Sequence, residues 1–126
     1  MDPRLKLPHN PHFPSWPGLT RPSTSRHFSV RERGGWIYIM TNRPNGILYV
    51  GVTADLARRV WQHREGLIEG FTKRYGLKRL VYVERYDDIR TAIQREKNLK
   101  HWSRAWKVRL IVEANPNWDD LYSRIA

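Results

Sequence analysis

Two tyrosines, an arginine and a glutamate are the side chains of this sequence whose types and spacing could support chemistry together. Tyr38 and Tyr49 lie in two short β-rich strings on either side of a tight turn. Arg59 follows Tyr49 by ten residues, and Glu96 comes later in the chain. A candidate base, a cation and a carboxylate in one small domain suit the hydrolysis of a phosphodiester bond. The set therefore suggests a protein that cuts nucleic acid.

A β-hairpin is expected to hold the two tyrosines. Residues 36–41 and 47–52 are β-rich, and Asn45-Gly46 between them is the strongest short-range hairpin signal. Strand tyrosines are most often amphipathic core residues with the hydroxyl at the rim, so the hairpin by itself predicts packing. Tyr38 and Tyr49 suggest a site only in combination with an arginine and an inward acid.

The arginine belongs to a helix that is predicted to follow the hairpin and to run to about residue 67. Thr53 is its expected N-cap, with Asp55 in the positive first turn. Gly66 or Gly70 is expected to end it.

One face of this helix carries both a histidine and the arginine. Its apolar stripe at helical spacing is Leu56, Val60, His63 and Leu67. Arg59 lies one turn before His63 on the same side. A lone inward histidine is usually a satisfied core residue, and an arginine of an Arg58-Arg59 pair is usually solvated. Each therefore has a structural interpretation beside the functional one.

Glu96 breaks the pattern of a second helix, which is predicted over residues 89–100 with Asp87 or Asp88 as its cap. A carboxylate on an inward face is costly unless it meets a cation or a metal. Glu96 is therefore either a metal ligand or the acid of an ion pair with a lysine or arginine, unless it is simply exposed. The face in question comprises Ile89, Ala92, Ile93, Glu96 and Leu99.

The rest of the chain supplies a third strand and further helices. Residues 71–76 are predicted as a basic loop, 80–86 as a strand and 104–113 as a helix, with a short helix after Pro116. The order is strand, strand, helix, strand, helix, helix. The expected fold class is α/β of the α+β type, with a small three-stranded antiparallel sheet flanked by helices.

Composition favours a single basic domain that binds a polyanion. The chain has 126 residues, a formal net charge of +11 and no cysteine. It can therefore form neither a disulfide nor a thiolate zinc site. Such an excess of positive charge favours nucleic acid as partner. No apolar run is long enough to cross a membrane and no signal peptide is evident, so a cytoplasmic protein without a membrane partner is expected.

Residues 1–34 are predicted to be a basic, proline-rich and disordered extension of a domain that spans 35–126. Six of the eight prolines lie there, which excludes a packed core or a regular helix. Its three histidines, His9, His12 and His27, have no regular ligand spacing and are not expected to bind metal.

The sequence resembles the GIY-YIG nuclease family, and especially its small stand-alone bacterial members. The two halves of the signature are Trp36-Ile37-Tyr38, where Trp36 replaces the usual first glycine, and Tyr49-Val50-Gly51. Three further strings follow in the family's order: Asp55-Leu56-Ala57-Arg58-Arg59 with His63, then Arg95-Glu96-Lys97-Asn98-Leu99-Lys100, then Asn115-Pro116-Asn117-Trp118-Asp119-Asp120-Leu121. The resemblance covers residues 35–121.

The resemblance implies a role for each residue of the candidate catalytic set, which is Tyr38, Tyr49, Arg59, His63 and Glu96. Glu96 would bind Mg²⁺ or Mn²⁺, and Arg59 would neutralise the phosphate. Tyr49 would be the general base for the attacking water, and Tyr38 would orient that water or hold Tyr49. The pKa of an unperturbed tyrosine is about 10, so positive charge or a hydrogen bond to His63 must lower the pKa of Tyr49. Expected nucleic-acid contacts are Arg58, Lys73, Arg74, Lys97, Lys100 and Asn115.

The expected function is therefore that of a metal-dependent endonuclease, most simply on DNA in repair or recombination, with RNA as the second candidate substrate. A non-catalytic DNA- or RNA-binding module of the same fold is the main alternative. A scaffold that docks to another protein through the tryptophan-rich helices is a third. No helix-turn-helix or zinc finger supplies base readout, which favours structure-directed or weakly specific cutting.

Overall fold

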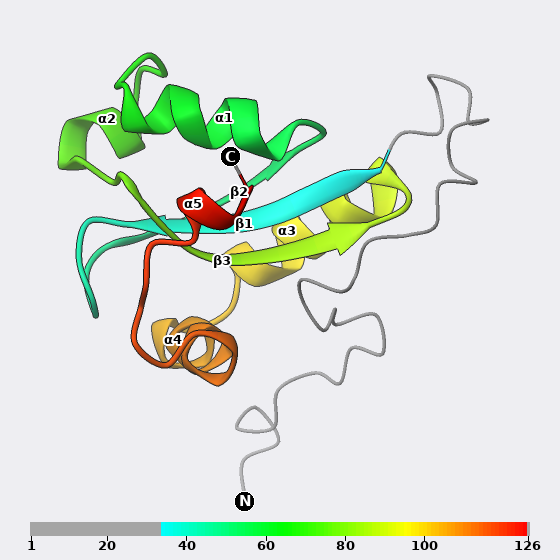
Figure 1. Ribbon diagram of the computed structural model, residues 1–126. Coiled ribbons are helices and arrows are strands. Elements are labelled where there is room, and N and C mark those ends of the chain that lie inside the picture. Colours follow the sequence, from blue (N-terminus) through cyan, green and yellow to red (C-terminus); the bar gives the residue numbers. More distant parts are fainter. Residues whose placement is uncertain (1–33, 126) are drawn as a thin grey trace, which may run out of the picture.

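A computed structural model describes residues 34–125. Residues 1–33, and with them almost the whole of the predicted extension, lie outside this range. The described residues form three strands and five helices, which Figure 1 shows in their order along the chain.

The sheet has three antiparallel strands in the order β2-β1-β3. The strands are β1 (Gly35–Thr41), β2 (Leu48–Thr53) and β3 (Arg79–Tyr86). The predicted hairpin is confirmed: Asn45 adopts a left-handed φ of 59°, and the Gly46 amide donates to the Arg43 carbonyl at 2.8 Å. A short asparagine tolerates this conformation better than most residues. The α+β fold with a three-stranded antiparallel sheet is likewise confirmed.

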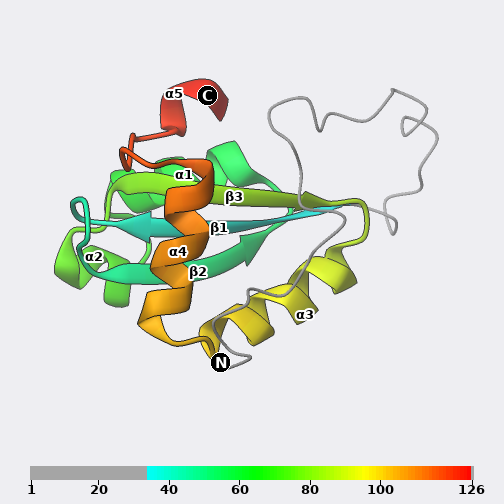
Figure 2. The ribbon, with the colours of Figure 1, turned by 90° about the horizontal axis from the view of Figure 1, so that it is seen from below.

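Five helices surround the sheet. They are α1 (Leu56–Arg64), α2 (Phe71–Tyr75), α3 (Ile89–Lys100), α4 (Arg104–Ala114) and α5 (Tyr122–Ile125). Figures 1 and 2 show α1, α2 and α5 on one face of the sheet and α3 and α4 on the other. Among residues 34–125, no helix is long and apolar enough to cross a membrane.

Strand β1 lies in the middle of the sheet and divides the core into two. Successive side chains of a strand point to opposite faces, so Ile37 and Ile39 pack toward α3 and α4 while Tyr38 and Met40 pack toward α1. Each face thus has its own apolar cluster, and Tyr38 is among the largest fully buried side chains. The first candidate tyrosine therefore lies under α1.

Two predicted helix details were wrong. Asp55 rather than Thr53 is the N-cap of α1, because its carboxylate accepts from the Arg58 amide while the Thr53 hydroxyl accepts from the Asp55 amide. Helix α1 also ends at Arg64 instead of near residue 67, because Gly66, one of the two glycines expected to end it, turns the chain with a left-handed φ of 70°. Leu67 therefore leaves the helix and is 58% exposed instead of extending the apolar stripe.

The segment expected to be a basic loop is the short helix α2. A glycine flanks each end, and both have a positive φ: 118° at Gly70 and 65° at Gly76. Thr72 is the buried residue of α2. The helices predicted over 89–100 and 104–113 and the third strand are confirmed within one or two residues, with Asp88 as the N-cap of α3. The short helix expected after Pro116 is α5, which begins at Tyr122.

Strand β3 is an edge strand whose outer backbone groups are met by a later segment. The Leu80 amide donates to Asp120 at 3.1 Å, and the Leu80 carbonyl accepts from the Leu121 amide at 2.7 Å. Arg64 of α1 also donates to Asp120 at 2.6 Å. This segment therefore covers the sheet edge and ties it to α1.

Candidate active site

Tyr38 reaches the candidate site by crossing the neighbouring strand at Gly51. Tyr38 is paired with Gly51 in the register of β1 and β2. A Cβ atom at position 51 would lie 2.4 Å from both Cζ and the hydroxyl oxygen of Tyr38. Real Cβ atoms do not approach so closely, so the missing side chain of Gly51 is what allows the tyrosine ring to lie across β2.

A buried hydrogen-bond chain links Tyr38, His63 and Thr72. The Tyr38 hydroxyl lies 2.8 Å from Nε2 of His63, and Nδ1 of His63 lies 2.8 Å from Oγ1 of Thr72. Burial, aided by the charge of Arg59, lowers the pKa of His63 to about 4. The imidazole is therefore neutral at pH 7, so it donates to one hydroxyl and accepts from the other.

Tyr38 is held in its protonated form. Its side chain is 2% exposed, and burial raises its pKa, with further contributions from Tyr49 and Glu96 that outweigh the opposing effect of Arg59. The desolvated phenol cannot easily become a phenolate. This environment suits a residue that holds or orients a neighbour.

Tyr49 lies between the buried chain and the surface. It is paired with Met40, so its side chain lies on the same sheet face as Tyr38. Its ring centroid is 6.2 Å from that of Tyr38 and 5.5 Å from that of His63. Unlike Tyr38, Tyr49 is only partly buried. Of the two tyrosines it is the one that solvent can reach.

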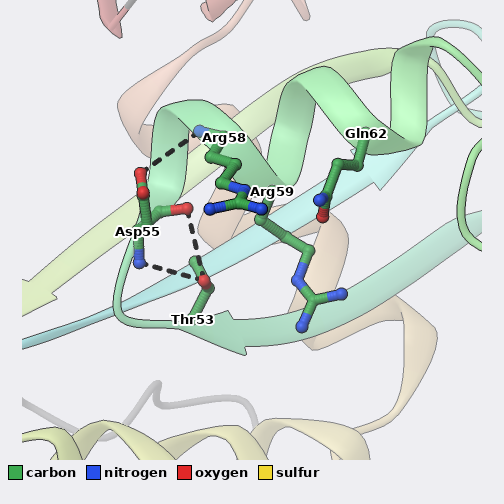
Figure 3. Close-up of a pocket in the computed structure, with 5 residues that line it drawn as sticks. All are labelled: Thr53, Asp55, Arg58, Arg59 and Gln62. Atoms are coloured by element: carbon green, nitrogen blue, oxygen red, sulfur yellow. Dashed lines mark hydrogen bonds between the residues drawn. The ribbon is translucent and has the colours of Figure 1, made fainter.

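Two arginines of α1 line a surface hollow of about 350 Å³. Its lining residues are Thr53, Asp55, Arg58, Arg59 and Gln62. Figure 3 shows the side chains of Arg58, Arg59 and Gln62 extending to the same side of α1. Among the ion pairs of the described residues, none includes Arg58 or Arg59. Both guanidinium groups are thus available to an anionic ligand.

Glu96 lies at the boundary of its helix face rather than in the core. Ala92 and Leu99 are buried as expected, whereas Ile93 is exposed and the Glu96 side chain keeps 12% of its surface. The Glu96 carboxylate pairs with the Lys100 ammonium at 2.6 Å. The carboxylate also raises the pKa of Tyr38, and Arg59 opposes that effect. The charges of Glu96 and Arg59 therefore both act on Tyr38, although the three residues come from different elements.

The donor set fits a divalent cation held by one carboxylate. No cluster of three or more metal-ligating side chains (histidine, cysteine, aspartate or glutamate) occurs in residues 34–125, which argues against an all-protein cage. A single hard carboxylate at the surface is compatible with Mg²⁺ or Mn²⁺, because Mg²⁺ keeps several waters and often binds through one or two carboxylates plus phosphates. Lys100 must give up its contact with Glu96 for this to happen.

The remaining predicted contacts are scattered over the fold. Lys73 and Arg74 lie on α2, and Lys97 is exposed on α3. Asn115 differs from them because it is buried. Its amide group donates to the carbonyls of Val81 and Asp119, and its oxygen accepts from the Asp119 amide. Asn115 therefore holds the segment that covers β3, and its side chain is not available to a ligand.

Sequence reasoning missed a buried charged cluster that anchors α3. Glu84 is completely buried on β3 and accepts from the hydroxyls of Tyr82 and Tyr86 at 2.5 and 2.8 Å. Arg95 of α3 donates to both Glu84 oxygens at 2.9 Å. Because Glu96 follows Arg95 directly, this ion pair sets the position of the candidate metal ligand. The sequence did contain a signal for this cluster, because an acid in an apolar strand lies two residues from each of two tyrosines.

Comparison with known proteins places the chain in a family. The model of the GIY-YIG catalytic domain matches residues 34–109. The chain belongs to the GIY-YIG family. The matched range contains the two tyrosines, Arg59, His63 and Glu96, so the family relationship includes every catalytic candidate. A nuclease-type domain that interacts with nucleic acid is therefore the general class to which this protein belongs.

The relatives of this chain carry names that state no activity. A UPF0213 protein of Staphylococcus saprophyticus is 36% identical over 78 residues, which cover 62% of this chain and 94% of the relative. A UPF0213 protein of Natronomonas pharaonis is 39% identical over 66 residues, covering 52% of this chain and 78% of the relative. The solution NMR structure of the UPF0213 protein BH0048 of Bacillus halodurans is similar at 28% identity with a TM-score of 0.45, and the match covers 69% of this chain and 92% of that one.

Proposed function

We propose that this GIY-YIG protein is a metal-dependent endonuclease that hydrolyses phosphodiester bonds of DNA. The observation that carries the proposal is the meeting of Tyr38, Tyr49 and His63, with ring centroids 5.5 to 6.2 Å apart, within electrostatic reach of Arg59, which forms no ion pair within residues 34–125. A module that only binds nucleic acid has no need for a buried tyrosine–histidine–threonine chain next to its cationic surface.

Tyr49 is the proposed general base. It takes a proton from a water molecule while the water oxygen forms a bond to phosphorus and the bond from phosphorus to the leaving oxygen breaks. The partial exposure of Tyr49 allows it to reach that water, and Arg59, whose charge acts on the neighbouring Tyr38 and His63, is proposed to supply the positive charge. Tyr38 and His63 are proposed as positioning residues, because both are buried and hydrogen-bonded to each other.

Arg59 is the proposed phosphate ligand. Its planar fork of donors suits two phosphate oxygens at once, and it stabilises the negative charge that develops on them. Arg58, in the same hollow, is proposed to contact a neighbouring phosphate.

Glu96 is proposed to hold Mg²⁺ or Mn²⁺. The bound ion would supply Lewis-acid stabilisation of the phosphate and of the leaving oxygen. Lys100, released from Glu96, would then be free to contact the nucleic-acid backbone, as proposed also for Lys97.

The decisive experiment compares tyrosine variants in a DNA cleavage assay with Mg²⁺, Mn²⁺ or EDTA. Tyr49→Phe is expected to lose about 10²–10⁴ in rate, the scale of general-base catalysis, while it still binds DNA. Tyr122→Phe, another partly buried tyrosine, is the matched control and should cut normally. Wild-type-like cleavage by Tyr49→Phe overturns the assignment of the base. If only Tyr38→Phe loses cleavage, Tyr38 is the base and Tyr49 the positioning residue.

The role of Glu96 is tested in parallel. Glu96→Ala should abolish metal-dependent cleavage, whereas Glu113→Ala, which removes the acid of another i,i+4 ion pair, should not. A binding module that does not cut DNA is the competing function, and the contact of Glu96 with Lys100 favours it. That function predicts salt-sensitive DNA binding without cleavage in any metal.

A further inference from the structure

A row of aromatic rings leads from the candidate site to the surface of α2. The ring of Phe71 lies 6.3 Å from that of Tyr49, with an angle of only 24° between the planes. Tyr75 continues the row, with its ring centroid 4.9 Å from that of Phe71. Phe71 and Tyr75 are each 45% exposed. Tyr49, Phe71 and Tyr75 are called the aromatic row below.

The exposed part of the aromatic row is held in place by the hydrogen-bond chain of the site. Phe71 and Tyr75 are four residues apart on α2, which places them on one side of the helix. Thr72 is buried and lies 2.8 Å from His63 through its hydroxyl. The contact that satisfies the site histidine thus also orients α2, so that its two aromatic rings face outward.

Positive charge accompanies these rings. Lys73 and Arg74 lie between Phe71 and Tyr75 and are both exposed. Arg74 has no ion-pair partner among residues 34–125, and Lys73 pairs with the highly exposed Glu69, a type of contact that contributes little. Exposed aromatic faces next to cations are what a single nucleic-acid strand needs, because bases stack on the rings while the cations follow the backbone.

We propose that the aromatic row binds an unpaired nucleotide of the DNA substrate next to the bond that is cut. Bases of an intact duplex stack on one another and cannot present their faces to Phe71 and Tyr75. An unpaired base can stack there, and the row then leads its strand to Tyr49 and the arginines of α1. The preferred substrate class is therefore DNA with an unpaired segment at the cleavage site, such as a single strand, flap or branch. This inference rests on the proposed endonuclease function for its link to cleavage.

The test measures DNA binding by the full-length protein in EDTA, so that no cleavage occurs. Wild-type protein and variants are titrated by fluorescence anisotropy against a single-stranded oligonucleotide and a duplex of equal length. Phe71→Ala and Tyr75→Ala should each weaken single-strand binding about tenfold, the scale of one base–aromatic stack, and leave duplex binding unchanged. Unchanged duplex binding also demonstrates that the variants are folded.

Two control variants separate stacking from general effects. Trp61→Ala removes an aromatic side chain that is also 45% exposed but takes part in none of the ring contacts of residues 34–125. It should bind both DNAs as the wild type does. Tyr75→Phe keeps the ring and should keep single-strand affinity. The proposal is overturned if Trp61→Ala behaves like Phe71→Ala, or if the alanine variants lose duplex and single-strand affinity equally.

Failure of this inference can be told apart from failure of the proposed function. If the wild type cuts DNA but Phe71→Ala retains the wild-type ratio of single-strand to duplex affinity, the aromatic row has no such role while the nuclease stands. If the wild type never cuts DNA but the alanine variants selectively lose single-strand binding, the aromatic row stands as a binding surface and the nuclease function fails.

Discussion

At the scale of single residues, the two halves of the family signature depend on each other for a steric reason. Tyr38 and Gly51 are register partners, and the tyrosine ring occupies the space that a side chain at position 51 would need. Gly51 is therefore required by its neighbour rather than by its own backbone conformation. The position of Tyr38, and through it the contact with His63, depends on a hydrogen atom being the only side chain there.

We expect Gly51→Ala to displace the Tyr38 ring. Overpacking of a well-filled core typically costs about 1–3 kcal/mol, so the variant should unfold at lower urea concentration than the wild type. Cleavage should fall as well, because Tyr38 no longer holds its contacts. A second substitution, Tyr38→Leu, shortens the residue that clashes with the new methyl group. The two changes in free energy of unfolding should therefore be non-additive, and strict additivity in a double-mutant cycle would refute the steric coupling.

At the scale of elements, a buried ion pair adds to the apolar packing that positions α3. Arg95 reaches across to Glu84 on β3 with two hydrogen bonds, and its guanidinium carbon also lies 5.1 Å from the ring centre of Trp102. The Glu84 carboxylate has two tyrosine hydroxyls as further donors. Such a carboxylate is stable in the core only while these partners remain.

Removal of Arg95 should therefore be costly. Arg95→Met leaves Glu84 charged and buried without its cation, and breaking a buried pair in this way costs about 3–5 kcal/mol. Arg90→Met, on the same helix, removes an arginine that pairs with Asp88 at the surface and should cost far less, because solvent screens an exposed pair. Urea denaturation of both variants measures the difference. Similar losses for both would mean that the buried pair contributes no more than a surface one.

The elements also differ in how well the sequence alone predicted them. Asn45-Gly46 and the helical pattern of residues 89–100 are local signals, and both predicted the structure correctly. Helix α2 was missed because five residues are too few for an intrinsic helix signal, and the buried contact of Thr72 with His63 helps hold it in place. The roles of Glu84 and Asn115 depend on contacts with residues far away in the sequence, so local signals could not predict them.

At the scale of the whole molecule, global stability should respond to acid through one buried histidine. The pKa of His63 is about 4 in the folded protein and near 6.5 when unfolded. Between these values the unfolded chain binds the extra proton, so the contribution of His63 is complete above about pH 6.5 and is lost as pH falls toward 4. From pH 7 to pH 5 the free energy of unfolding should drop by about 2 kcal/mol.

The matched variant for this effect is His63→Gln, which keeps a polar side chain but does not titrate. It should be less stable than the wild type at pH 7, and its stability should change much less between pH 7 and pH 5. Urea denaturation at both pH values gives the comparison. An equal pH dependence in wild type and variant would assign the effect to other groups, such as the remaining histidines.

The positive net charge is a second property of the whole molecule, and it follows from composition alone. The chain carries a net charge of +11, and Arg58, Arg59 and Arg74, which form no ion pair within residues 34–125, lie on α1 and α2, the helices that flank the candidate site. Composition could not show that Lys73 and Lys100 are partly neutralised by Glu69 and Glu96. Those pairings depend on the backbone at the start of α2 and along α3, which brings side chains four residues apart into contact.

The cover over the outer edge of β3 has a consequence for how the protein is made. The backbone of Leu80 and Val81 is satisfied by residues 115–121, which a ribosome adds more than thirty residues later. Until then a growing chain exposes an open sheet edge, and α1 lacks its tie to Asp120 through Arg64. Packing of the sheet edge and of α1 is thus completed only after those residues have left the ribosome. During synthesis, a delay between translation and folding is built into the order of the elements.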